Sequence, residues 1–299
     1  MGKGKKTARD TVLMFCVGAT KSGTSWLHEA LVDHPACHLR TVKELHYFDA
    51  LEKGKFEPHI REITLWRDKL AARVADAKGA KKADLSRRIK DRDDWLQVLN
   101  GGGENPGAYM DYLTHGQGAA HVIGDVTPAY GLLPVARLRA MAELTDDVRF
   151  IYLMRDPVAR LWSHVRMIAT RRSETGILDP NKARNILMRT IAGDEREIEI
   201  RGDYAGALTR LHDAVPEGKL LTIFYEDLFG GDGMTRICDF LDLAAISGVQ
   251  TRRVHEGATL DMPERLRDKA QEWLAPQYDH VAHRLGRLPE AWQANRVKV

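Results

Sequence analysis

One segment near the start of the chain constrains the fold more than any other. Residues 15–26 read Phe-Cys-Val-Gly-Ala-Thr-Lys-Ser-Gly-Thr-Ser-Trp, an apolar stretch followed by a short glycine-bounded loop and then a helical pattern. Gly18 and Gly23 stand five positions apart, as glycines do in phosphate-binding loops. Such a loop points free backbone N–H groups and the positive end of a helix dipole at one spot. The segment therefore predicts a strand, an anion site and a helix, in that order.

The position of the lysine separates this loop from that of common nucleoside triphosphatases. Those proteins place Lys directly after the second glycine, followed by a Ser or Thr that holds magnesium. Here Thr24 follows Gly23, and Lys21 lies inside the loop. We therefore expect Lys21 to reach a terminal group of the ligand without the usual magnesium-binding partner. A generic glycine-rich turn is the simplest alternative.

Short apolar segments rich in β-branched and aromatic residues predict the strands of the sheet. They cover residues 12–18, 121–125, 149–154 and 220–225, and a further short strand is expected at 37–40. Helical patterns separate these segments: one spans 24–34, and Asp156-Pro157 supplies an N-cap and a first-turn proline for another. Strands that alternate with helices predict the α/β class, a P-loop-like parallel sheet flanked by helices. We expect a single domain over residues 1–299.

A charged insert at residues 53–103 interrupts this alternation. Residues 53–94 hold 13 Lys and Arg against 8 Asp and Glu, whereas the whole chain holds 45 against 42, a net charge of +3. The insert thus carries +5, and the remaining residues are slightly acidic. A solvated pair of helices is one interpretation of this pattern. The other is a lid or substrate rim that draws an anionic acceptor towards the sheet.

Composition bounds the partners and the compartment. A net charge of +3 is too small for a polybasic surface that binds nucleic acid through many phosphate contacts. Three cysteines make a disulfide framework implausible, and no Cys/His cluster suggests zinc. No apolar run approaches the roughly 20 residues that span a bilayer, so no integral membrane association is expected. These observations favour a cytoplasmic protein without a metal centre.

The loop resembles the 5′-phosphosulfate loop of sulfotransferases that use 3′-phosphoadenylyl sulfate (PAPS), in which a Lys precedes Gly-Thr after the first strand. Residues 20–26 nearly reproduce the version found in cytosolic members of that family. In those relatives the Trp lies against the adenine, although a buried position on the helix is equally consistent with Trp26. The resemblance implies that PAPS is bound by Lys21, Ser22, Gly23, Thr24, Ser25 and Trp26.

A second segment strengthens this resemblance. Residues 149–166 are similar to the family's 3′-phosphate motif, in which an Arg ends a strand and a Ser follows eight residues later; Arg155 and Ser163 occupy those positions. An Arg offers a planar fork to phosphate oxygens, and a hydroxyl adds a neutral donor. Alone, Arg-Asp-Pro could simply be a salt-bridged helix cap. Together, the two motifs suit a ligand phosphorylated at both ends.

The catalytic base is expected within residues 41–49. This segment resembles the Lys-Glu-x-His-Phe-Phe motif of carbohydrate and related bacterial sulfotransferases, in which the Glu is the general base. By this resemblance Glu44 would take the proton of an acceptor hydroxyl, while Lys21 would stabilise charge on the departing phosphate. His46 is the rival base, because cytosolic members use a His. We favour Glu44.

The resemblance extends over about residues 11–292, with two departures. Many relatives carry Lys where Val126 stands, so its role in neutralising the leaving group is in doubt here or passes to Lys43 or Arg201. The late basic loop that closes over the 3′ end of the donor is matched only approximately, by Arg252 and Arg253 followed by a glycine.

The sequence thus predicts a PAPS-dependent sulfotransferase, similar to the carbohydrate and heparan type but with a cytosolic-type loop. Its acceptor would be a hydroxyl of a glycan, a glycolipid or a small molecule, and in-line transfer would need no metal. Two alternatives stay open. One is a P-loop kinase or nucleoside triphosphatase, for which Asp125 is the one plausible magnesium partner. The other is a non-catalytic nucleotide-binding protein.

Overall fold

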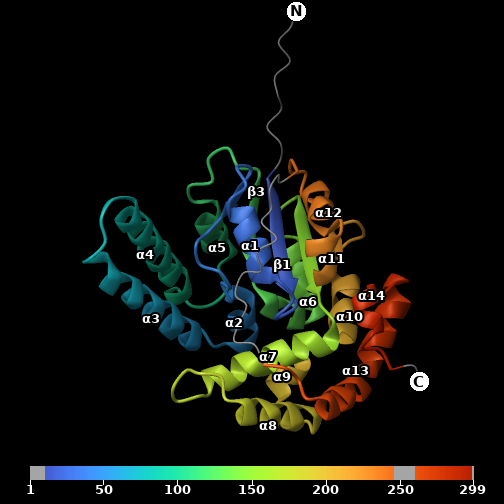
Figure 1. Cartoon of the computed structure of the whole chain (residues 1–299). Helices are drawn as coiled ribbons and strands as arrows, with labels where there is room; N and C mark the ends of the chain where they lie inside the picture. Colours follow the sequence, from blue (N-terminus) through green and yellow to red (C-terminus); the bar gives the residue numbers. More distant parts are fainter. Residues whose placement is uncertain (1–10, 246–259, 298–299) are drawn as a thin grey trace, which may run out of the picture.

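The computed structural model describes residues 11–245 and 260–297, and its centre is one parallel sheet of five strands (Figure 1). The strand order is β2-β3-β1-β4-β5, and every neighbouring pair is parallel. The strands are β1 (Val12–Gly18), β2 (Cys37–Leu39), β3 (Val122–Val126), β4 (Val148–Met154) and β5 (Leu220–Phe224). Helices cover both faces of the sheet, which confirms the predicted α/β class.

Helices fill most of the chain between the strands. Up to β4 they are α1 (Thr24–Val32), α2 (Tyr47–Lys53), α3 (Glu57–Val74), α4 (Gly79–Asn100), α5 (Pro106–Thr114), the 3₁₀ helix η1 (Pro128–Leu132) and α6 (Val135–Ala142). After β4 they are α7 (Pro157–Arg171), α8 (Pro180–Ile191), α9 (Arg196–Ile200), α10 (Tyr204–Ala214), α11 (Tyr225–Gly230), α12 (Gly233–Phe240), α13 (Glu264–Leu285) and α14 (Glu290–Gln293). No helix in these described ranges is long and apolar enough to cross a membrane.

Strand β1 lies in the middle of the sheet, and all seven of its residues are buried. Because successive side chains of a strand point to opposite faces, residues 13, 15 and 17 join one core and residues 12, 14 and 16 another. Helices α5, α6, α7 and α10 contribute to the first core, and α1 and α12 to the second. Burial on both faces explains the continuous apolar run of β1, and it fixes the position of the loop that follows.

The predicted element boundaries hold to within two residues. Strand β1 and the start of α1 lie where the sequence places them, and the Asp156 carboxylate caps α7 by accepting a hydrogen bond of 2.8 Å from the N–H of Ala159. Helix α1 ends at Val32 rather than at His34. Residue 34 precedes a proline, which disfavours the helical conformation, and its ring instead accepts a hydrogen bond from the N–H of Ala36.

The charged insert contains α3 and α4, which lie side by side at the edge of the molecule (Figure 1). Leu70, Ala77 and Leu85 form a small core of their own between the two helices. One buried acid, Asp91 of α4, ties this pair to the sheet. Its carboxylate accepts hydrogen bonds from Nε of Arg40 at 2.6 Å, from the N–H of Thr41 at 2.5 Å and from the phenol of Tyr112 at 3.0 Å. The segment that follows β2 is thereby fixed against the insert.

We expect Asp91→Ala to lower the free energy of unfolding by about 3 kcal/mol, the lower end for the loss of one partner of a buried ion pair, because Arg40 keeps only its pair with the more exposed Asp94 at 3.2 Å. The side chain of Asp91 is 6% exposed and that of Arg40 is 9% exposed. Urea unfolding of the purified variant measures the change. Asp93→Ala is the control, since its carboxylate is 46% exposed and meets Arg67 at 3.4 Å, a surface pair worth at most about 1 kcal/mol. Equal losses in the two variants would contradict the anchoring role of Asp91.

Candidate active site

The glycine-bounded loop leaves β1 at Gly18 and enters α1 at Thr24. Lys21 and Gly23 have φ angles of 71° and 92°, in the left-handed region. A Cβ at Gly23 would lie 2.9 Å from the ring of Tyr225, so only glycine fits there. No side chain caps α1, and its first N–H groups are therefore left for a ligand. This is the loop geometry that the sequence predicts.

Positive charges converge on Lys21. Burial lowers the pKa of its amine, and the guanidinium groups of Arg155, Arg166 and Arg171 lower it further, while Glu44 acts in the opposite direction. Within the described residues, no carboxylate forms an ion pair with Lys21 or Arg155. Cations that lower the pKa of one another favour the binding of an anion among them, so the loop has the electrostatics of an anion site.

Arg155 follows β4, the neighbour of β1, and therefore opens onto the same edge of the sheet. Its guanidinium lies over the ring of Tyr225 at 4.7 Å. The phenol of Tyr204 donates to the carbonyl oxygen of Arg155 at 2.7 Å and accepts from its N–H at 3.1 Å. Ser163 lies two turns further along, half-buried on α7. The two predicted phosphate motifs thus stand on adjacent strands, with Tyr225 between Gly23 and Arg155.

Three residues need separate comment. Trp26 is 5% exposed and packs edge-on against Phe229 at 4.9 Å, which is the buried position that the sequence allowed as one of two roles. Val126 is 2% exposed within the smaller core, so its side chain contributes nothing to the site. Arg252 and Arg253 lie outside the described residues.

Glu44 lies in the segment between β2 and α2, with a φ of 63°. Its carboxylate is 43% exposed and pairs with Nζ of Lys43 at 2.6 Å, and Nε2 of His46 lies 3.6 Å away. Burial alone would raise the pKa of Glu44, but the hydrogen bonds from His46 and Lys43 outweigh burial and lower it to about 2. The group is therefore ionised at neutral pH, and it can accept a proton only when substrate displaces part of this charge.

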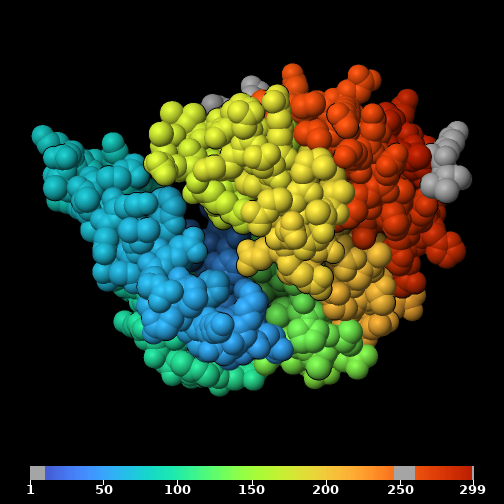
Figure 2. All heavy atoms as spheres, turned by 90° about the horizontal axis from the view of Figure 1, so that it is seen from below, coloured from blue at the N-terminus to red at the C-terminus, as the bar shows by residue number. Residues whose placement is uncertain are grey.

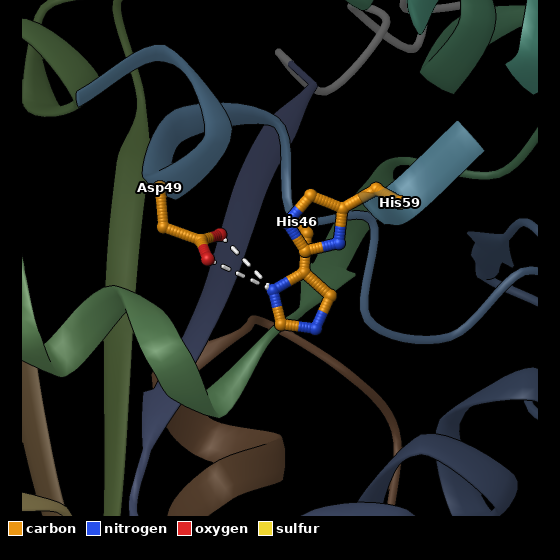
Figure 3. Close-up of side chains that lie close together, drawn as sticks. All are labelled: His46, Asp49 and His59. Atoms are coloured by element: carbon orange, nitrogen blue, oxygen red, sulfur yellow. Dashed lines mark hydrogen bonds and ion pairs between the residues drawn. The ribbon is translucent and has the colours of Figure 1, made fainter. Parts of the chain in front are cut away.

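His46 is held on both sides by acids. Its Nδ1 lies 3.0 Å from Asp49, and Figure 3 shows the two interactions that join this nitrogen to the Asp49 carboxylate. Burial opposes the charged ring, but hydrogen bonds to Asp49 and Glu44 raise the pKa of His46 to about 9. A ring that already carries its proton at neutral pH cannot accept another, whereas the Glu44 carboxylate is ionised.

The ring of His59, from α3, stacks on that of His46 (Figure 3). The centroids are 4.5 Å apart and the planes differ by 16°. Nitrogen atoms of both rings and an oxygen of Asp49 lie within 4.8 Å of one another, which makes this the cluster among the described residues that could hold a metal ion. The lone pairs of stacked imidazoles lie in parallel planes and do not converge, so one ring would have to rotate before both could bind one ion.

A cleft of about 740 Å³ opens beside Glu44. Its walls come from α1, from residues 41–46, from α3 and α4, and from Arg171 at the end of α7. In Figure 2 the surface is hollowed between the cyan helix α3 and the yellow-green end of α7, with dark blue residues on the floor. The insert therefore forms one wall of the cleft that contains Glu44, whereas its action as a lid stays a prediction.

Sequence reasoning missed the neighbours that complete this site. Tyr225 begins α11 and reaches both Gly23 and Arg155, and His59 comes from the insert. Asp125 is 2% exposed and accepts hydrogen bonds from the hydroxyls of Thr127, Tyr109 and Tyr130 at 2.7–2.9 Å. No local pattern marks such contacts. The aromatic residue at position 225, the last residue of a predicted strand, is the one available signal.

We expect the stability that His46 contributes to depend on pH. The folded chain holds the ring proton more tightly than the unfolded chain, so the contribution is complete below about pH 6.5 and is lost as pH rises through about 9. The unfolding free energy of His46→Gln should therefore fall below that of wild type by more at about pH 6 than at about pH 10. His28→Gln should show the opposite trend: burial lowers the pKa of His28 to about 4, so near pH 6 only the unfolded chain binds this proton, and the substitution should cost less at about pH 6 than at about pH 10. A pH-independent effect of His46→Gln would contradict the prediction.

Comparison with solved structures places the fold among sulfotransferases. The sulfotransferase from Alicyclobacillus acidocaldarius superposes with a TM-score of 0.62 and 20% identity, covering 96% of this chain and all of the other. The sulfotransferase domain of the Synechococcus PCC 7002 olefin synthase gives 0.53 and 18%, covering 96% and 98%. The sulfotransferase domain from the curacin biosynthetic pathway gives 0.52 and 17%, covering 94% and 99%.

Two comparisons of the sequence gave different results. None of the curated proteins matches the chain significantly. The family model described as "Sulfotransferase family", however, matches residues 14–247, which include the glycine-bounded loop, Glu44 and Arg155. On the strength of that match, which covers most of its length, the chain belongs to the sulfotransferase family.

Proposed function

We propose that the protein transfers a sulfuryl group from PAPS to a hydroxyl of an acceptor, with Glu44 as general base. The observation that carries this proposal is that both Arg155 and Glu44 act electrostatically on Lys21, the lysine of the phosphate loop. An anion site and a carboxylate that faces an open cleft are thus neighbours. Transfer between a bound donor and a hydroxyl in the cleft requires this arrangement.

The residues around the loop fit the donor. Its 5′ end would lie on the uncapped N-terminus of α1 and against Lys21. The hydroxyl of Ser22 is buried beside the phenol of Tyr204 without a well-aligned hydrogen-bond partner, so a phosphate oxygen could fill that need. Arg155 and Ser163 would hold the 3′-phosphate.

In the proposed reaction the acceptor oxygen attacks sulfur and the bond between sulfur and the phosphate oxygen breaks, which releases adenosine 3′,5′-bisphosphate. The carboxylate of Glu44 takes the hydroxyl proton. Lys21 offsets the negative charge that grows on the departing phosphate, and the first N–H groups of α1 do the same from fixed positions. Lys43, which pairs with Glu44, or Arg201 would replace the lysine missing at position 126.

The proposal is tested by incubating the protein with PAPS and pooled hydroxyl acceptors and measuring adenosine 3′,5′-bisphosphate. Calorimetric titration of that product measures binding separately. Arg155→Ala should weaken binding of the bisphosphate at least tenfold, whereas Arg139→Ala, on the exposed face of α6, should leave it unchanged. No turnover with any pool and no binding of the product would refute the proposal.

The same experiment separates the two alternatives. A kinase or triphosphatase needs an acidic partner for magnesium, and Asp125 already binds three hydroxyl groups in the interior. A magnesium-dependent ATPase assay should therefore give no activity. Binding of the bisphosphate without turnover would favour a non-catalytic nucleotide-binding protein.

Several finer points belong to the same proposal. We infer that the acceptor is a glycan, a glycolipid or a small molecule, since the cleft is open to solvent and is bounded by the insert. We also propose that residues 1–299 form a single domain and that the protein acts in the cytoplasm, where its low cysteine content suits a reducing environment.

A further inference from the structure

Arg160 carries a charge where charges are rare. It lies in the first turns of α7 and is 1% exposed, and burial lowers the pKa of its guanidinium. In the described part of the chain no carboxylate pairs with it, and its Nη1 atom is buried without a hydrogen-bond partner. A buried charge without a partner strongly destabilises a fold. A residue kept at such a cost needs a counter-ion, and the described residues supply none.

The neighbours of Arg160 connect it to the predicted phosphate motifs. A Cβ at residue 202 would overlap Nη2 of Arg160, so Gly202 makes room for the guanidinium. Among the residues that act electrostatically on Arg160, Tyr204 has the largest effect on the pKa of its guanidinium. The phenol of Tyr204 in turn bonds to the backbone of Arg155 and lies beside the hydroxyl of Ser22. One aromatic side chain thus separates Arg160 from both predicted phosphate motifs.

Among the described residues, no carboxylate forms an ion pair with Arg160. After burial and two tyrosines, the largest electrostatic influences on it come from Arg201 and Arg155, which are both cations. His164 lies one helical turn further along α7, near the same positive charges. Burial is the main cause that lowers the pKa of His164 to about 2, and the charges of Arg160 and Arg201 lower it further. His164 is therefore neutral, and its Nδ1 is buried without a hydrogen-bond partner. The region therefore has two buried groups, the guanidinium of Arg160 and Nδ1 of His164, whose partners are not among the described residues.

We propose that Arg160 is a positioning residue whose buried charge is balanced by the anion bound at the phosphate loop. This inference rests on the proposed function only in taking that anion to be the donor. The charge acts through a low-dielectric interior that screens it little, so it raises the affinity for the anion without touching it. Gly202 leaves the space that the guanidinium of Arg160 occupies, and so sets the distance of this charge from the phosphate loop.

The test compares Arg160→Met and Arg160→Lys with wild type by calorimetric titration of adenosine 3′,5′-bisphosphate and by thermal unfolding. Arg160→Met should weaken binding at least tenfold, while its unfolding temperature without ligand stays unchanged or rises, because an unpaired buried charge has been removed. Arg160→Lys keeps the charge and should retain affinity within about threefold of wild type. Gly202→Ala displaces the guanidinium and should give an intermediate loss.

Arg149→Met is the matched control. Arg149 is also largely buried, but it pairs with Asp147 at 2.6 Å and with Asp242 at 2.8 Å, at the opposite end of β4. Its loss should lower the unfolding temperature and leave the affinity unchanged. The inference is overturned if Arg160→Met behaves in the same way, or if Arg160→Lys fails to restore binding in a folded protein.

Inorganic sulfate separates this inference from the proposed function. If wild type does not bind the bisphosphate, the donor assignment fails. Stabilisation of wild type by sulfate, together with a loss of that stabilisation in Arg160→Met, would still support Arg160 as the buried charge of an anion site. Equal stabilisation of both proteins by sulfate would overturn it.

Discussion

Glu44→Gln should lower kcat by about 10³-fold, within the range typical for loss of a general base, and leave the affinity for adenosine 3′,5′-bisphosphate unchanged. The amide keeps the size of the carboxylate and can still accept a hydrogen bond from Lys43. It cannot take a proton from the acceptor. Steady-state kinetics with PAPS and an identified acceptor give kcat, and calorimetric titration of the bisphosphate gives the affinity.

The low pKa of Glu44 makes this prediction specific. The carboxylate owes its pKa of about 2 to hydrogen bonds from His46 and Lys43 that outweigh burial. An acceptor that enters the cleft must loosen one of these bonds before the proton moves. His46→Gln removes one of them, so it should raise the pKa of Glu44 and reduce kcat far less than Glu44→Gln does.

Asp33→Asn is the matched control for Glu44→Gln. Asp33 lines the same cleft but is exposed and follows the end of α1, so its neutralisation should leave kcat within about twofold, as is usual for an exposed group remote from the reacting atoms. Full activity of Glu44→Gln, combined with an inactive and folded His46→Gln, would move the role of base to His46.

The parts of the fold that the sequence predicts well are those determined by local rules. The seven buried residues of β1 and the capping Asp156 are adjacent in the chain to the features that identify them, namely a glycine-bounded loop and a proline. The loop conformation follows from the same few residues, because Gly23 takes up a positive φ and lies against Tyr225. Residues close in sequence determine such features, so these features can be predicted before the fold is known.

The neighbours of the site obey a different rule. His59 reaches His46 only because α3 folds back along the cleft, and Asp91 fixes Arg40 from a distance of 51 residues. The sequence of residues 53–103 predicts the charge of the insert and its helices, but it does not predict which face of these helices packs towards the sheet. Arg160 belongs to the same class, since a charged residue in an amphipathic helix is expected at the surface until its burial is observed.

Trp26 shows how one position can satisfy two local rules. The motif places it where relatives hold adenine, and the helical period places it on the buried face. In the fold its ring packs edge-on with Phe229 in the smaller core. Tyr225, between the loop and Arg155, has the more open ring of the two. Tyr225 is therefore a candidate for an aromatic contact with the adenine, in addition to Trp26.

Lys21→Met should lower kcat/KM for PAPS by about 10²–10³-fold, the usual loss when one group that stabilises transition-state charge is removed. Methionine keeps much of the length of the side chain and removes its charge. Without ligand, the amine is repelled by Arg155, Arg166 and Arg171, and burial together with these charges lowers its pKa. The variant should therefore unfold no more easily than wild type, so the kinetic loss cannot be attributed to misfolding.

The lowered pKa of Lys21 gives this prediction a second readout. An anion bound at the loop stabilises the charged amine and raises its pKa again, so binding of the bisphosphate should take up protons at alkaline pH. Calorimetry in two buffers of different ionisation enthalpy measures that uptake, which should diminish in Lys21→Met. Lys219→Ala is the control, because this lysine pairs with Asp147 at the far end of the sheet and should change neither quantity. If Lys21→Met retains wild-type kcat/KM, the negative charge on the departing phosphate is offset by the N–H groups of α1 without Lys21.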